Sequence, residues 1–168
     1  MQTIFVDVDT QFDFCAPEGA LFVAGSDKLG PALADLTAYA IAHNIPIVGS
    51  VDSHAFDAWE FVGARASGPQ GERPGFPPHC IKGTRGWLKV DGTLAPRSRF
   101  VPNVPMTQRD IRDVVRREQP QQLLLEKEVY SLFANPNAEA VLEELTREAT
   151  RFVVYGVALD YCVRAAAF

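Results

Sequence analysis

The sequence has little that would tie it to a membrane, to nucleic acid or to an oxidising compartment. No apolar run is long enough to span a bilayer, and the first residues, MQTIFVDV, lack the pattern of a secretory signal. The net charge is −5 and the basic residues are scattered, so no phosphate-backbone partner is indicated. The three cysteines, Cys15, Cys80 and Cys162, show no C-x-x-C spacing. We therefore expect a cytoplasmic protein with reduced thiols and no nucleic-acid or membrane partner.

Strand and helix patterns alternate along the chain, which at 168 residues is long enough for one domain, placed at 1–168. Apolar, β-branched runs predict strands at 3–8, 46–51, 122–126 and 151–157, the last of them buried. Amphipathic stretches predict helices at 26–43, 108–118 and 138–148. Residues 63–107 carry many glycines and prolines and predict a long irregular excursion. This order predicts an α/β fold of three layers, with a doubly wound, mostly parallel sheet between helices.

Reactive side chains follow each expected strand. In chain order they are Asp7 and Asp9, then Asp52 and His54, then Lys127, and finally Asp160 and Cys162. Because ligands bind at the carboxyl ends of parallel strands, these side chains should meet at one edge of the sheet.

The sequence stops at Phe168 inside an expected helix that has no stop signal. Four strands alone would also leave the last one at an edge of the sheet. We therefore expect a terminal strand–helix portion to be missing from this sequence or to come from another chain. The same feature leaves open a non-catalytic subunit or binding module.

Asp52, His54 and His79 are candidate metal ligands. Residues two apart in an extended segment point the same way, so Asp52 and His54 converge, and His79 would complete a set of two histidines and one carboxylate. Glu60 could add a further oxygen. Zinc, manganese and iron all suit such a set. His43, at the end of the first expected helix, is interpreted as structural.

Cys162 is the candidate nucleophile. It lies between an expected strand and an expected helix, where the helix N-terminus favours a thiolate and should lower the thiol pKa. Lys127 would stabilise that thiolate, and Asp9 would accept the thiol proton and pass it to a leaving amine. The alternative is a buried structural cysteine.

The run Asp7-Val8-Asp9-Thr10 after a strand also resembles the haloacid dehalogenase phosphotransferases, with Asp7 as nucleophile and Asp9 as general acid. That family places paired acidic residues after a late strand, where this sequence has Asp160-Tyr161-Cys162. It also has no use for the candidate metal ligands, so this interpretation is the weaker one.

Taken together, five segments resemble the isochorismatase-like cysteine hydrolases, and within them the nicotinamidases. They are Asp9-Thr10-Gln11-Phe12-Asp13-Phe14, Asp52-Ser53-His54 with Glu60, Pro77-Pro78-His79-Cys80-Ile81-Lys82-Gly83-Thr84, Lys127 with Tyr130-Ser131-Leu132-Phe133, and Gly156-Val157-Ala158-Leu159-Asp160-Tyr161-Cys162-Val163. The resemblance implies that fold and a catalytic set of Asp9, Lys127 and Cys162. It further implies one divalent metal ion, with zinc favoured over manganese or iron, on Asp52, His54 and His79.

The resemblance also implies the rest of the pocket. A cis peptide between Val157 and Ala158 is expected, with the Ala158 and Cys162 amides forming an oxyanion hole. Phe14, Phe76 and Tyr130 would contact the substrate. The expected activity is hydrolysis of nicotinamide or a similar small carboxamide to the acid and ammonia. A different amide, a ureido compound or an enol ether is the alternative substrate, and a homo-oligomer is compatible with the family.

Overall fold

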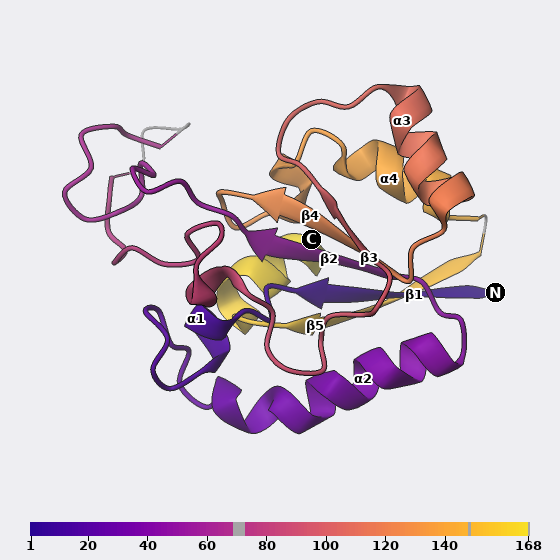
Figure 1. Ribbon diagram of the computed structural model, residues 1–168, viewed down its shortest axis with the longest axis horizontal. Coiled ribbons are helices and arrows are strands. Elements are labelled where there is room, and N and C mark those ends of the chain that lie inside the picture. Colours follow the sequence, from indigo (N-terminus) through magenta and orange to yellow (C-terminus); the bar gives the residue numbers. More distant parts are fainter. Residues whose placement is uncertain (69–72, 148, 168) are drawn as a thin grey trace.

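A parallel sheet of five strands forms the centre of the computed structural model, which describes residues 1–68, 73–147 and 149–167 (Figure 1). The strand order is β3-β4-β2-β1-β5, and every neighbouring pair is parallel. The strands are β1 (Gln2–Val8), β2 (Ile47–Asp52), β3 (Ser98–Val101), β4 (Gln122–Lys127) and β5 (Thr150–Gly156). β1, β2 and β4 are buried almost throughout, as their apolar runs require for a sheet covered on both faces.

Helices cover both faces of the sheet, so the predicted three-layer α/β fold is confirmed (Figure 1). On one face α2 (Gly30–Ala42) packs Leu36 and Ala40 against Phe5 and Ile47. The main apolar core lies on the other face, under α3 (Gln108–Arg112), its π-helical continuation Asp113–Glu118, and α4 (Ala138–Leu145).

Short helices complete the described chain. They are α1 (Phe12–Cys15), α5 (Arg164–Ala167), three 3-10 turns at Ser26–Leu29, Arg85–Trp87 and Leu132–Ala134, and a π-helical turn at Leu159–Val163. The 3-10 turn Ser26–Leu29 leads directly into α2, so the helix expected at 26–43 begins in that form. α4 ends at Leu145, and Glu148 and Phe168 lie outside the described residues.

Two sequence predictions about strands were wrong. The excursion at 63–107 contains β3, which pairs with β4 from Ser98↔Gln122 to Val101↔Leu125. A run of four residues is too short to show a period, and tertiary pairing creates the strand. β5 is partly exposed rather than buried, because it pairs only with β1 among the described strands. Phe152 in this strand is 44% exposed.

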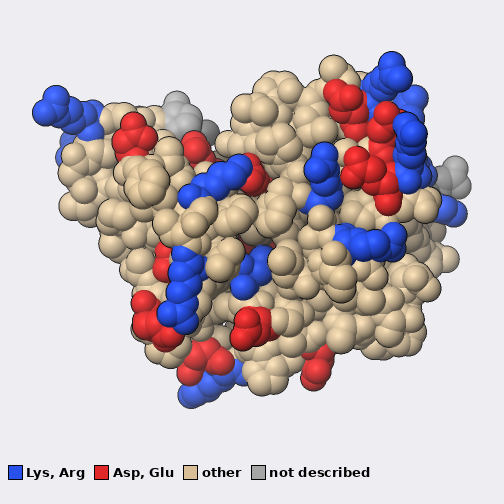
Figure 2. All heavy atoms as spheres, in the orientation of Figure 1, with Lys and Arg blue, Asp and Glu red and all other residues tan. Residues whose placement is uncertain are grey.

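Charged side chains of both signs lie close together on the face shown in Figure 2. They gather over α3 and α4, where Arg112 and Arg116 both pair with Glu144. Among the described residues, no helix has the length and apolar character needed to cross a membrane.

Candidate active site

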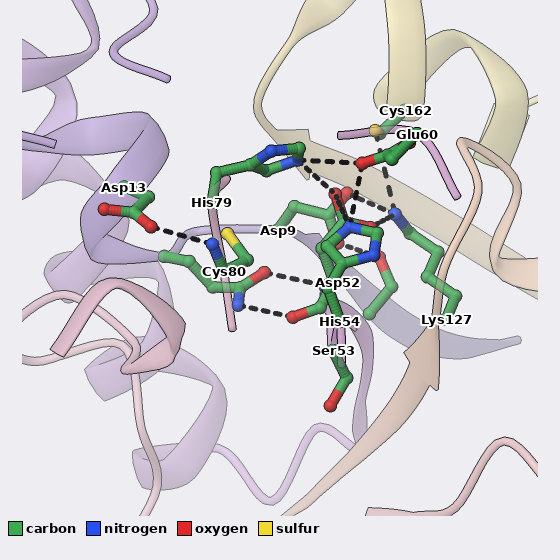
Figure 3. A network of polar contacts seen from close by, with 12 residues as sticks. Asp9, Asp13, Asp52, Ser53, His54, Glu60, His79, Cys80, Lys127 and Cys162 are labelled. Carbon is green, nitrogen blue, oxygen red and sulfur yellow. Dashed lines mark hydrogen bonds and ion pairs between the residues drawn. The ribbon is translucent and has the colours of Figure 1, made fainter. Parts of the chain in front are cut away.

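The carboxyl ends of four strands bring the predicted site residues together (Figure 3). Asp9 follows β1, Asp52 ends β2, Lys127 ends β4, and Cys162 lies in the π-helical turn after β5. Parallel pairing fixes this geometry, because β2 and β4 are in register from Ile47↔Gln122 to Asp52↔Lys127. The expectation that strand ends deliver these side chains to one edge is therefore met for these four residues.

Lys127 lies at the centre of the cluster, and its side chain is fully buried. Its Nζ is 2.8 Å from Asp9 Oδ2 and 3.7 Å from Cys162 Sγ, and it also donates to Asp52 Oδ1. Burial disfavours the ammonium ion, but the Asp52 and Asp9 carboxylates hold the Lys127 pKa well above its usual value. Lys127 therefore joins the candidate nucleophile, its candidate base and a candidate metal ligand in one contact network.

The prediction of a lowered thiol pKa was wrong for this pocket. Burial raises the pKa of Cys162, the Asp9 carboxylate adds to that rise, and Lys127 only partly opposes it. The Lys127 charge is shared with Asp9 and Asp52, so it cannot stabilise a thiolate as a free ammonium would. The thiol is therefore protonated at rest, and attack requires a base within reach.

Asp9 is placed to be that base. Burial raises its pKa against the opposing attraction of Lys127, which makes it the more basic of the two carboxylates, because the Asp52 pKa is lowered to about 2. Ser50 Oγ donates to Asp9 Oδ1 over 2.7 Å. Asp9 Oδ2 is paired with Lys127 Nζ at 2.8 Å, and a carboxylate oxygen of Asp9 lies within 4.8 Å of the Cys162 sulfur.

Asp52, His54 and His79 each offer one ligand atom within 4.8 Å of the others, and all three are buried. Asp52 Oδ2 is 3.8 Å from His54 Nε2 and 3.9 Å from His79 Nε2. Glu60 Oε1 faces the same two nitrogens at 3.1 and 3.2 Å. The Pro77 carbonyl, 2.8 Å from His79 Nδ1, favours the tautomer that leaves Nε2 free for a metal.

The donor set fits a divalent metal ion. Both ring nitrogens of His54 are buried without a hydrogen-bond partner among the described residues, although Glu60 lies near Nε2. Such orphaned nitrogens are costly unless something else satisfies them, and a metal ion does so at Nε2. Ser53, between the two candidate ligands, points away and accepts a hydrogen bond from the Trp87 indole.

A cavity of about 370 Å³ lies next to the Cys162 thiol. Its walls are mostly apolar and aromatic, and they include Phe14, Leu21, Phe22, Phe76, Tyr130 and Tyr161 beside Asp52, Glu60, His79 and Cys162. The rings of Phe14 and Phe76 lie 5.5 and 6.0 Å from the His79 ring, and Tyr130 packs edge-on to Phe76 at 6.5 Å. All three predicted substrate contacts thus line one cavity together with Cys162, the candidate nucleophile.

The turn before Cys162 has the predicted cis peptide between Val157 and Ala158. The Ala158 N–H donates to no backbone or side-chain acceptor in the part of the chain that the structure describes. The Ala158 carbonyl accepts from Tyr161 and Val163, which starts the turn containing Cys162.

Sequence reasoning gave no role to Gln11 and Asp13, although both belong to the first motif. The Gln11 amide, fully buried, accepts from Asp52 N over 2.7 Å and donates to Asp52 O over 2.8 Å. Asp13 accepts from Cys80 N over 2.7 Å and so anchors the segment that carries His79. A Cβ on Gly86 would lie 1.9 Å from the Asp13 carboxylate, so that approach requires glycine.

Two other candidates lie outside the cavity lining. Asp7 is fully buried in β1 and pairs with Lys89 at 2.6 Å, so it is not available as a nucleophile. His43 stacks on Tyr39 with ring centroids 4.0 Å apart and contacts the Tyr39 carbonyl through Nδ1, as its structural interpretation predicted.

Comparisons with a family model and with solved structures show which proteins this chain resembles. The family model described as the isochorismatase domain matches residues 3–168. The pyrazinamidase of Pyrococcus horikoshii in complex with zinc is 24% identical, with a TM-score of 0.67 over 99% of this chain and 76% of that one. The yeast nicotinamidase is 26% identical, with a TM-score of 0.67 over 99% and 80%. An isochorismatase family protein from Desulfovibrio vulgaris is 20% identical, with a TM-score of 0.66 over 99% and 72%. Comparison with curated proteins by sequence gives no significant match.

Proposed function

Because this chain belongs to the isochorismatase family of hydrolases, we propose that it is a metal-assisted cysteine amidohydrolase acting on nicotinamide or a similar small carboxamide. The observation that carries the proposal is the buried Lys127, which contacts both the Cys162 thiol and Asp9. Similarity to solved nicotinamidases and pyrazinamidases supports the substrate class. The aromatic cavity walls suit a flat ring.

In the first half of the proposed reaction, Asp9 takes the thiol proton as Cys162 Sγ attacks the amide carbon. The Ala158 and Cys162 N–H groups donate to the oxyanion that forms, where fixed donors in a site sheltered from water stabilise developing charge. Asp9 then gives its proton to the leaving amine, the carbon–nitrogen bond breaks, and ammonia departs from a thioester on Cys162. Asp9 serves as base and then as acid, which its raised pKa favours.

In the second half, water attacks the thioester carbon while Asp9 accepts a proton from it. The carbon–sulfur bond breaks, the product acid leaves, and the proton returns to Cys162. Lys127 keeps its charge throughout and balances the changing charge between Asp9 and the sulfur. One water is consumed and one ammonia released per turnover.

Asp52, His54 and His79 would hold the metal ion, with Glu60 beside the two histidines. When bound, the ion supplies a Lewis-acidic position that a ring nitrogen can occupy. The residues around it orient the ring: Phe14 and Phe76 lie beside His79, on the same cavity wall. Positioning of this kind is a large part of catalysis in enclosed sites.

The direct test is ammonia release from nicotinamide by the purified protein, before and after chelation and after metal is restored. We expect release that falls at least about tenfold on chelation and returns with zinc, manganese or iron. A panel of other carboxamides, ureido compounds and enol ethers locates the preferred substrate. Metal-loaded protein that releases no ammonia from any carboxamide would contradict the proposal.

Metal affinity should rise with pH. Burial disfavours a charged ring, but the Asp52 and Glu60 carboxylates raise the pKa of metal-free His54 to about 9. Below that pH a metal ion must displace a proton, so affinity should increase up to about tenfold per pH unit and level off above about pH 9. Competition with a chelator of known protonation, between about pH 6 and 9, measures this slope.

His43→Gln is the matched control for that measurement, because His43 is exposed and packs on Tyr39 away from the cluster. It should leave the slope unchanged. An affinity that does not vary across this pH range would contradict protonation of His54 in the metal-free site.

A further inference from the structure

The backbone that carries Asp9 is in an unusual conformation. Asp9 has a φ of 48°, in the left-handed region that residues other than glycine seldom adopt. Such a conformation persists only where surrounding contacts hold it. Ser50 and Lys127 hold the Asp9 carboxylate. The backbone of Asp9 is held by hydrogen bonds from Asp9 N to Ser50 O over 3.1 Å and from Gln11 N to Asp9 O over 2.7 Å.

Further support for the turn comes from a buried cluster of Asp7, Thr10 and Lys89, which we call the clasp. Thr10 Oγ1 donates to Asp7 Oδ1 over 2.9 Å, and this hydrogen bond joins the residues on either side of Val8 and Asp9. Lys89 Nζ donates to Asp7 Oδ2 over 2.6 Å and to Thr10 Oγ1 over 2.5 Å. Asp7 and Thr10 are fully buried, and the Lys89 side chain is 2% exposed.

The backbone around the clasp is fixed as well. Val90 N donates to Thr10 O over 3.0 Å, and Phe12 N donates to Leu88 O over 2.8 Å. The segment 88–90 therefore runs alongside the turn and presents Lys89 to it. Gln122 donates from β4 to Asp7 Oδ2 over 3.1 Å, so the clasp is also tied to the strand that ends in Lys127.

We propose that the clasp is a positioning device for Asp9: it fixes the left-handed turn so that the carboxylate faces Cys162. The charges of Asp7 and Lys89 cancel within the clasp, and neither residue lines the cavity, so neither touches substrate. Asp7 and Lys89 act on Asp9 through Thr10, which is the next residue in the chain. The inference rests on the proposed role of Asp9 as the base for Cys162.

Thr10→Val tests the clasp, because it removes the hydroxyl that joins the ion pair to the turn while keeping the side chain's size. With the carboxylate less well placed, kcat should fall about tenfold while KM stays unchanged. Thr10→Ser keeps the hydroxyl and should restore most of the rate. Thr37→Val is the matched control: Thr37 is a buried threonine in α2 whose hydroxyl donates to Leu33 O, and its loss should leave kcat unchanged.

A second readout does not depend on the substrate. Cys162 is the cysteine that lines the cavity, and its alkylation by iodoacetamide, followed on its own peptide by mass spectrometry, reports how readily the thiol loses its proton. Alkylation should slow about tenfold in Thr10→Val and not in Thr10→Ser. If the wild type hydrolyses no carboxamide but alkylation still follows this pattern, the clasp stands and the proposed function fails.

Asp7→Leu combined with Lys89→Met covers the case in which Thr10→Val does not fold, because leucine, unlike asparagine, cannot accept the hydrogen bond from Thr10 Oγ1. Removing both charges together leaves no unpaired buried ion, so this double variant should fold. It should show the same loss of kcat and the same slow alkylation. Folded variants of either kind that match the wild type in both measurements would overturn the proposal.

Discussion

Cys162→Ala should lower turnover of nicotinamide by at least about four orders of magnitude while substrate affinity changes by less than about threefold. In the proposed mechanism the thiol forms and breaks the covalent bond, and no other described cysteine lines the cavity. The aromatic walls and the candidate metal ligands remain, so binding should persist. Single-turnover assays and calorimetric binding to the variant separate the two effects.

Cys15→Ala is the matched control. Cys15 is also a buried, free cysteine, but it lines a different surface groove, beside Lys89. Its loss should cost about 1 kcal/mol of stability and leave turnover close to wild type. Steady turnover by Cys162→Ala above about one-hundredth of the wild-type rate would contradict the proposed covalent mechanism.

Lys127→Met should both destabilise the protein and stop turnover. Lys127 is fully buried between Asp9 and Asp52, and its removal takes away the cation that lies between these two carboxylates. Breaking a buried ion pair from one side costs about 3–5 kcal/mol. We expect a loss of that size in urea unfolding of the metal-free protein, and at least about a thousandfold loss of turnover.

The loss of stability caused by Lys127→Met should become smaller as the pH falls. The Asp52 pKa is lowered from 3.8 to about 2, so the stability that Lys127 supplies to Asp52 is fully present above about pH 4 and is lost as pH falls toward 2. Lys28→Met, at an exposed lysine, is the control and should change neither stability nor turnover. A Lys127→Met protein as stable as the wild type at neutral pH would show that the buried cation is dispensable.

The central strands and the convergence of the site residues could be predicted from the sequence, because both depend on local pattern. Runs such as 122–126 are apolar enough to be strands on their own evidence, and parallel strands must end at one edge. β3 could not be predicted, because a strand of four residues carries too little periodic signal. The exposure of β5 depends on which strand pairs beside it, which its own apolar run does not specify.

The thiol pKa and the roles of Gln11 and Asp13 were missed for a different reason. The Cys162 pKa depends on burial and on how Lys127 divides its charge between two carboxylates. Gln11 and Asp13 act through hydrogen bonds to Asp52 and Cys80, which lie 41 and 67 residues away in the chain. Contacts at such separations follow from the assembled fold, and a local motif does not reveal them.

The pairing of β1 with β5 has a consequence for folding. It joins segments 148 residues apart, from Gln2↔Thr150 to Val8↔Gly156, and Asp9 and Cys162 follow directly from its two strands. Closing so large a loop is entropically costly, and folds dominated by such contacts form slowly. The proposed base and nucleophile therefore come together only when β1 and β5 have paired. Any fluctuation that separates these two strands also separates Asp9 from Cys162, so the proposed activity should be gained and lost together with β1–β5 pairing.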